Sequence, residues 1–237
     1  DALPIYLAVQ IGARGRETVA EKFPMDAFVD AWRETIETVA DEGPRQSGAA
    51  DASAGSHVSV LLHYCSSPHT TGRYLREAGA ERFNVLSAGF RCPDNVLEKW
   101  GFPTPVPDWP AHDIELSLDA GADELLSRMP PGFEPLLYVW VDSGPKNVPE
   151  GLERIPGTKV CYLIDTHIAT DLRIEMARAF DVTFLAQAGQ LEQFRQAGIP
   201  NVFWLPLACR LPMHEQADGA ERTTDVAFVG SVDAEAD

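Results

Sequence analysis

Polar side chains follow directly after four apolar runs of the chain. They are Asp119, Asp142, Asp165 and Gln187. If these runs are parallel strands of one sheet, the residues that follow them meet at its carboxyl edge, where open α/β sheets bind ligands. Carboxylates and an amide at that edge can bind sugar hydroxyls or a cation, or transfer a proton. Each aspartate can also simply cap the helix or turn that follows it.

A histidine lies two residues beyond one of these aspartates, in the sequence Asp165-Thr166-His167. Imidazole titrates near neutral pH, so it can act as a base or as a hydrogen-bond partner of a phosphate or a sugar. We therefore select His167 and Asp165 as the candidate catalytic residues. The alternative is that the histidine has a purely structural role.

A second candidate loop follows the apolar run that ends at Tyr64. Residues 65–72 read Cys-Ser-Ser-Pro-His-Thr-Thr-Gly, and these small hydroxyl residues lead into a predicted helix start. Hydroxyls beside a helix N-terminus can bind an anion or a sugar hydroxyl. We select Ser67, His69 and Thr70 as candidate contacts, and the alternative is an ordinary connection capped by Ser or Thr.

Several familiar catalytic and metal-binding motifs are missing from the sequence. The glycine-containing segment 12–15 matches neither the dinucleotide nor the phosphate-loop pattern, and no GxSxG elbow is present. The histidines and cysteines within 63–69 and 209–214 lack the paired spacing of a zinc site, so we predict no metal site. Cys161 lies inside an apolar run, which favours a buried thiol over a nucleophile.

These side chains would be positioned by a sheet that the hydrophobic pattern predicts. From about residue 57 onward, apolar β-rich runs alternate with segments of helical period. The predicted strands are 57–64, 83–87, 113–118, 136–141, 159–164, 181–186, 201–207 and 225–229. Most are continuous apolar runs, as expected when helices cover both faces. The sequence therefore predicts an α/β, Rossmann-like, mostly parallel sheet with helices on both faces.

Helices are predicted between these strands, at 71–78, 93–100 and 190–197, and each is expected to stop at the glycine that follows it, Gly79, Gly101 or Gly198. Another helix is capped by Thr170. Its core-facing stripe is predicted to be Leu172, Met176, Ala179 and Phe180. The proline-rich segment 102–110 is predicted to be a connecting loop whose bulky residues anchor it to the core.

The two ends of the chain differ from this alternating region. Residues 1–56 contain a possible strand, an amphipathic helix and a Gly/Ala/Ser/Asp tract that we expect to be a flexible loop. Residues 210–224 are polar and rich in turn formers. We therefore divide the chain into an extension, 1–56, a Rossmann-like domain, 57–209, and a segment, 210–237, that contains a linker and one strand.

The amino-acid composition disfavours some classes of binding partner. The chain of 237 residues has 36 acidic and 19 basic side chains, a net charge of −17, which disfavours nucleic acid and anionic membranes as partners. No apolar run approaches the roughly 18 residues of a membrane span. Four cysteines at 65, 92, 161 and 209 show no CxxC spacing, which is typical of reduced thiols and predicts a cytoplasmic protein.

A combination of segments resembles the N-terminal half of CgeB-like (spore maturation type) glycosyltransferases. The segments are 138–142 (YVWVD), 159–167 (KVCYLIDTH), 180–187 (FDVTFLAQ), 198–209 (GIPNVFWLPLAC) and His214. Residues 71–79 resemble the first helix of such domains, and 225–231 (DVAFVGS) is similar to the strand that opens their second domain. The resemblance covers roughly residues 57–231.

This resemblance implies a GT-B fold, in which two Rossmann-like domains face a cleft and the second holds the nucleotide sugar. The chain is then similar to the acceptor-side domain, and 210–237 carries only the linker and first strand of a truncated second domain. We expect no cofactor in this chain, a nucleotide-sugar donor for the complete enzyme, and no activity without the missing C-terminal donor-binding domain.

The resulting expectation is a metal-independent transfer of a sugar to a glycan, protein or small-molecule acceptor. His167 or Asp165 would be the base. The acceptor or sugar contacts would be Ser67, His69, Thr70, Asp119, Asp142 and Gln187. The alternatives are a non-catalytic Rossmann-like binding or interaction module, and a sugar epimerase or hydrolase of the same architecture.

Overall fold

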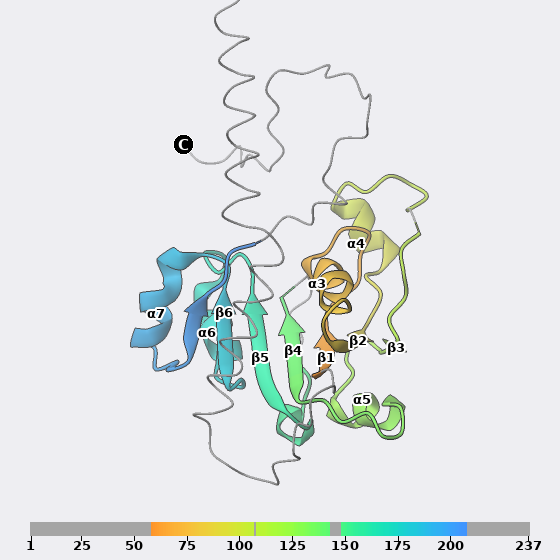
Figure 1. The fold of residues 1–237 in the computed structure, drawn as a ribbon. Helices are drawn as coiled ribbons and strands as arrows, with labels where there is room; N and C mark the ends of the chain where they lie inside the picture. Colours follow the sequence, from red (N-terminus) through yellow and green to blue (C-terminus); the bar gives the residue numbers. More distant parts are fainter. Residues whose placement is uncertain (1–57, 107, 143–147, 208–237) are drawn as a thin grey trace, which may run out of the picture. The chain divides into compact units, whose positions relative to one another are not determined.

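The core of the fold is a seven-stranded sheet in which all neighbouring strands run parallel (Figure 1). The computed structural model describes residues 58–106, 108–142 and 148–207. The strands are β1 (Ser59–His63), β2 (Asn84–Gly89), β3 (Ile114–Glu115), β4 (Leu137–Val141), β5 (Thr158–Leu163), β6 (Val182–Leu185) and β7 (Val202–Trp204). Their parallel arrangement confirms the predicted α/β, Rossmann-like class.

The chain enters this sheet near its middle. The spatial order is β3-β2-β1-β4-β5-β6-β7, so the first three strands build outward in one direction and the last four in the other. β1 and β4 lie side by side, with Val60 opposite Leu137 and His63 opposite Trp140. The boundary between them is the topological switch point of a doubly wound sheet, where such folds bind ligands.

The central strands are mostly apolar because both of their faces are covered. All five residues of β4 are buried, and so are all four residues of β6. The main hydrophobic core includes side chains from the sheet and from the connections around it, such as Leu61, Tyr138, Leu163, Ile174 and Phe194.

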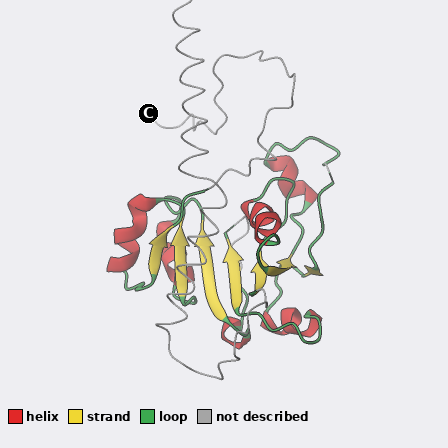
Figure 2. Cartoon of the chain, in the orientation of Figure 1, coloured by secondary structure: helices red, strands yellow, loops and turns green. Residues whose placement is uncertain are grey.

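Helices of modest length connect the strands. They are α3 (Thr71–Gly79), α4 (Asp94–Lys99), α5 (Ala122–Arg128), α6 (Thr170–Ala177) and α7 (Leu191–Gln196), with short 3-10 turns η1 (Leu152–Arg154) and η2 (Ala188–Gln190). Right-handed crossovers that run in opposite directions place their helices on opposite faces of a sheet. Accordingly, α3 lies in front of the sheet and α6 behind it (Figures 1 and 2).

The three helices end at or near the predicted glycines, but only two of these glycines have the left-handed conformation of a cap. Gly101 and Gly198 follow α4 and α7 with φ of 82° and 86°, the left-handed conformation that favours glycine. Gly79 instead lies inside α3, which continues one residue further than predicted. The helix α5, which the hydrophobic pattern did not predict, buries Ala122 and Leu125.

The predicted stripe of α6 is also partly wrong. Leu172 is 50% exposed, whereas Ile174, Met176 and Ala177 are buried. The helix therefore faces the sheet with a different side, and Arg173 is buried on it. The third strand is shorter than predicted, since β3 has only two residues.

The loop at 102–110 is anchored as the sequence predicts. Trp109 is buried in a second hydrophobic cluster with Cys65, Phe90, Cys92 and Leu97, and Phe102 and Val106 pack against this cluster. No helix among the described residues is long and apolar enough to cross a membrane. The elements predicted at 1–56 and 225–229 lie outside the described residues.

Candidate functional site

The candidate site lies at the carboxyl edge of the sheet, where the loops after β1, β4, β5 and β6 emerge. The most constrained of these loops connects β5 to α6 and contains Asp165, Thr166 and His167. Asp165 and Ala169 have φ of 54° and 48°, a region that side chains other than glycine rarely adopt. Such conformations cost about 1–3 kcal/mol each and persist where surrounding contacts hold them.

A buried arginine supplies part of those contacts. Arg173 and Asp142 form an ion pair at 2.8 Å, and their side chains are only 4% and 3% exposed. Arg173 Nε also donates to the Ile164 carbonyl at 3.0 Å, and its Nη1 donates to the Ile168 carbonyl. The side chain therefore joins the end of β4 to both ends of the β5–α6 loop.

A second set of hydrogen bonds ties the same loop to β6. The backbone N–H and hydroxyl of Thr166 donate to Gln187 Oε1 at 3.1 and 2.8 Å. The Thr170 hydroxyl donates to the Thr166 carbonyl at 2.8 Å. Thr166 is fully buried, so these bonds form beneath the loop and not on its surface.

The two predicted catalytic residues lie on the outer side of this loop. Asp165 and His167 are both exposed, as is Ile168 between His167 and the helix. The fold thus brings an exposed carboxylate and an exposed imidazole onto one fixed loop. Of the residues that we selected as acceptor contacts, Asp142 is buried and pairs with Arg173, and Gln187 is half-buried and accepts hydrogen bonds from Thr166.

The β1–α3 loop presents a different set of groups. Ser67 is buried and donates from its hydroxyl to the His69 carbonyl at 3.2 Å. His69 is exposed, its ring stacks on Phe102 at 6.1 Å, and its Nδ1 lies 3.2 Å from the Tyr74 hydroxyl. Thr70 caps α3 by its backbone position, but its buried hydroxyl makes no hydrogen bond within the described residues.

Asp119 lies apart from the other carboxylates. It is exposed and comes four residues after β3, the edge strand. β2 and β1 separate β3 from β4 in the sheet, and three strand spacings amount to about 14 Å. The fold therefore groups Asp142 with Asp165 on neighbouring strands and leaves Asp119 at the side.

Two further histidines lie beneath this edge and are buried. His63 Nδ1 and the Tyr138 hydroxyl are 2.7 Å apart, and the rings of His112 and Tyr64 meet at 4.5 Å. Desolvation, helped by mutual repulsion with His112, lowers the pKa of His63 to about 3. Desolvation and the nearby Arg76 lower the pKa of His112 to about 4. Both imidazoles are therefore neutral at physiological pH.

The cysteines of the described residues are all buried. They are Cys65, Cys92 and Cys161. Burial raises the pKa of the Cys161 thiol to about 12, which fits the prediction that this thiol is buried and not a nucleophile. Among the residues that the structure describes, no group of three or more His, Cys, Asp or Glu side chains is arranged to hold a metal ion.

Sequence reasoning missed Arg173 and Trp109. No local signal marked Arg173, because it lies outside the predicted apolar stripe of its helix and its partner Asp142 belongs to a different element. Trp109 Nε1 donates to Ser66 Oγ at 2.7 Å, and the Arg91 guanidinium lies 3.6 Å above its ring. The tryptophan thus fixes the β1–α3 loop from the side, a contact between distant segments that no local pattern reveals.

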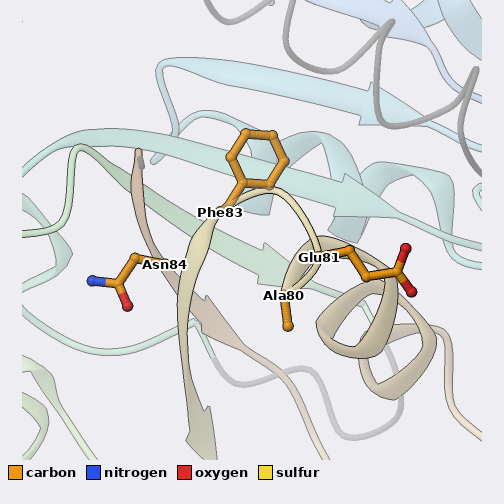
Figure 3. A pocket seen from close by; sticks show the side chains of 4 residues that line it. All are labelled: Ala80, Glu81, Phe83 and Asn84. Carbon is orange, nitrogen blue, oxygen red and sulfur yellow. The ribbon is translucent and has the colours of Figure 1, made fainter. Parts of the chain in front are cut away.

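A surface depression of about 440 Å³ lies elsewhere, at the turn between α3 and β2. It is lined by Ala80, Glu81, Phe83 and Asn84, whose side chains diverge from one another (Figure 3). Asn84 begins β2, so the depression lies at the amino edge of the sheet, opposite the candidate site. Convergent polar groups, which a binding site needs, are not found here.

Comparison of the chain with protein-family models, curated proteins and solved structures found no match.

Proposed function

We propose that the described residues form the acceptor-side domain of a glycosyltransferase, with the β5–α6 loop carrying the base. The observation that carries this proposal is the exposed pair Asp165 and His167 on a loop that Arg173 and Thr166 hold from beneath. A general base must be held within hydrogen-bond reach of the proton that it removes, and a fixed loop meets that demand. The proposal also draws on the sequence resemblance to CgeB-like glycosyltransferases.

In the proposed reaction, His167 accepts the proton of an acceptor hydroxyl while the hydroxyl oxygen attacks the anomeric carbon of the donor. The bond from that carbon to the phosphate oxygen breaks, and the nucleoside diphosphate leaves. The proton then passes from the imidazolium to solvent. Asp165 is the alternative base, or it stabilises the imidazolium.

The neighbouring β1–α3 loop supplies the proposed contacts to the acceptor, through Ser67, His69 and Thr70. Asp142 and Gln187 act on the acceptor indirectly, through the position of the loop. The nucleotide sugar would be held by a second domain, and we place the reaction in the cytoplasm because the four cysteines of the sequence show no CxxC spacing.

A transfer assay tests this proposal. The protein as its native host makes it would be incubated with UDP-, GDP- and dTDP-sugars and with simple acceptors, and both the nucleoside diphosphate and the mass of the acceptor would be measured. We expect release of the nucleotide together with a hexose-sized mass gain. Free sugar or an epimerised donor without transfer would favour a hydrolase or epimerase instead.

A binding module is the second candidate function, and one observation favours it. Ile168, which follows His167 in the sequence, and Leu172 in α6 are 56% and 50% exposed, so the loop and the first turn of the helix offer apolar surface as well as polar groups. Exposed apolar side chains of this kind suit a protein partner. Absence of any turnover of all donors, combined with stable capture of one protein by the same loop, would support this function over transfer.

A further inference from the structure

The buried pair Asp142 and Arg173 lies directly beneath the proposed catalytic loop but faces away from solvent. A buried ion pair is weak evidence for a role in stability, because the cost of desolvating both charges can exceed their attraction. Besides Asp142, Arg173 contacts the Ile164 and Ile168 carbonyls, which lie on either side of Asp165 and His167.

The loop between these two carbonyls has an unfavourable backbone conformation. Asp165, which lies between these carbonyls, and Ala169, which directly follows the second, both have positive φ, and the Ile168 amide closes the turn by donating to the Asp165 carbonyl at 2.9 Å. Without contacts from other parts of the protein, the backbone of this loop would relax to more favourable conformations. Arginine fits this role because its planar group offers several donors in fixed directions.

We infer that Arg173 is a positioning residue, oriented by Asp142, that holds the β5–α6 loop in the conformation that presents His167. The hold on the loop follows from the contacts alone, whereas its consequence for catalysis rests on the proposed glycosyltransferase function. Arg173 itself is buried and does not reach an acceptor, so it acts only through the backbone of the loop.

The test uses variants that distinguish a change in the β5–α6 loop from destabilisation of the whole protein. R173M alone removes the positive charge that pairs with the buried carboxylate of Asp142, which is expected to destabilise the whole protein. The double variant D142L/R173M removes both charges at once and replaces them with apolar side chains, a change that buried ion pairs often tolerate. R173K keeps a positive charge for Asp142 but cannot reach both carbonyls. R178M is the matched control, since Arg178 is exposed at the C-terminal end of the same helix.

Hydrogen–deuterium exchange of the full protein supplies a readout that does not depend on activity. We expect residues 164–169 to exchange about tenfold faster or more in D142L/R173M, while β5 and β6 exchange as in the wild type. R173K is expected to show an intermediate rate, and R178M the wild-type rate. An unchanged loop in both D142L/R173M and R173K would overturn the inference. If D142L/R173M does not fold, the exchange rate of residues 164–169 in R173K tests the inference in its place.

The catalytic consequence is read from kinetics. A misplaced base costs about 10²-fold in kcat. We therefore expect D142L/R173M to lose kcat by about that factor at nearly unchanged KM, because the acceptor contacts of the β1–α3 loop remain. Faster exchange with normal kcat would contradict the positioning role. If the wild-type protein shows no transfer at all, the proposed function fails, and the exchange experiment still decides whether Arg173 holds the loop.

Discussion

At the scale of single residues, burial divides the described histidines into two kinds. His63 and His112 are enclosed beneath the sheet edge and have lowered pKa values, about 3 and about 4, whereas His69 and His167 are exposed. A neutral buried imidazole serves packing and hydrogen bonding, as in the contact between His63 and Tyr138. Only the exposed histidines can meet a substrate, which is why His167 is a candidate base.

The buried histidines predict acid sensitivity. Because their pKa values are lower in the folded than in the unfolded protein, the unfolded chain binds more protons below about pH 6.5. Their contribution to stability is therefore fully present above that pH and is lost as the pH falls. Each of the two histidines can lower the free energy of unfolding by about 1.4 kcal/mol for every unit by which the pH falls in this range. Urea unfolding between pH 7 and pH 5 measures this slope.

The variant H112F serves as the control for that measurement. It removes one of the two titrating groups while keeping a ring against Tyr64, so the slope between pH 6.5 and pH 5 should fall by about half. A slope that is the same in the wild type and in H112F would show that His112 does not contribute.

At the scale of elements, Tyr64, which directly follows β1, packs closely against two glycines, Gly72 and Gly89. The start of α3 and the end of β2 both approach this tyrosine so closely that no side chain fits. A Cβ added at Gly72 would lie 2.3 Å from the ring, and one added at Gly89 would lie 1.9 Å from the Tyr64 carbonyl oxygen. Gly89 also has a φ of 148°. These close approaches position the β1–α3 loop and hence its candidate contacts.

The variant G89A is expected to lower the free energy of unfolding by about 3 kcal/mol or more, because a backbone clash is added to an unfavourable φ. G189A is the matched control, since a Cβ there meets no atom within 4 Å, and it should stay within about 0.5 kcal/mol of the wild type. Denaturant unfolding measures both variants. Equal stability of G89A and the wild type would mean that the backbone at β2 can move away from Tyr64.

Most of the strands and the fold class could be predicted from the sequence, because a parallel sheet covered on both faces leaves continuous apolar runs. The face of α6 could not be predicted, since its buried side includes Arg173, and the charge of that residue is offset by Asp142 on a different element. For the same reason, the sequence indicated Asp142 as an acceptor or sugar contact but not its buried ion pair with Arg173. Contacts between segments that are far apart in the sequence decide which face of a helix and which polar side chains are buried.

At the scale of the whole sheet, strand order explains which candidate residues meet. The order around β1 and β4 brings Asp142, at the end of β4, and the segments that follow β1, β5 and β6 to neighbouring strand ends, and it leaves β3 at the edge. The alternation of strands and helices carries no information about this order, so the separation of Asp119 from Asp142 could not be foreseen. Thr166 and Gln187, by contrast, are joined because β5 and β6 are neighbours.

The measurement that tests the account most directly is the turnover of sugar transfer by the native protein, compared with its variants H167A and D165N. Asparagine tolerates the left-handed conformation of residue 165, so D165N removes the charge without disturbing the turn. We predict that H167A lowers kcat by about 10²-fold or more, with unchanged hydrogen exchange in the β5–α6 loop, and that D165N lowers it less. Near-normal turnover in H167A would contradict the assignment of His167 as the base, and near-normal turnover in both variants would contradict a catalytic role for this loop.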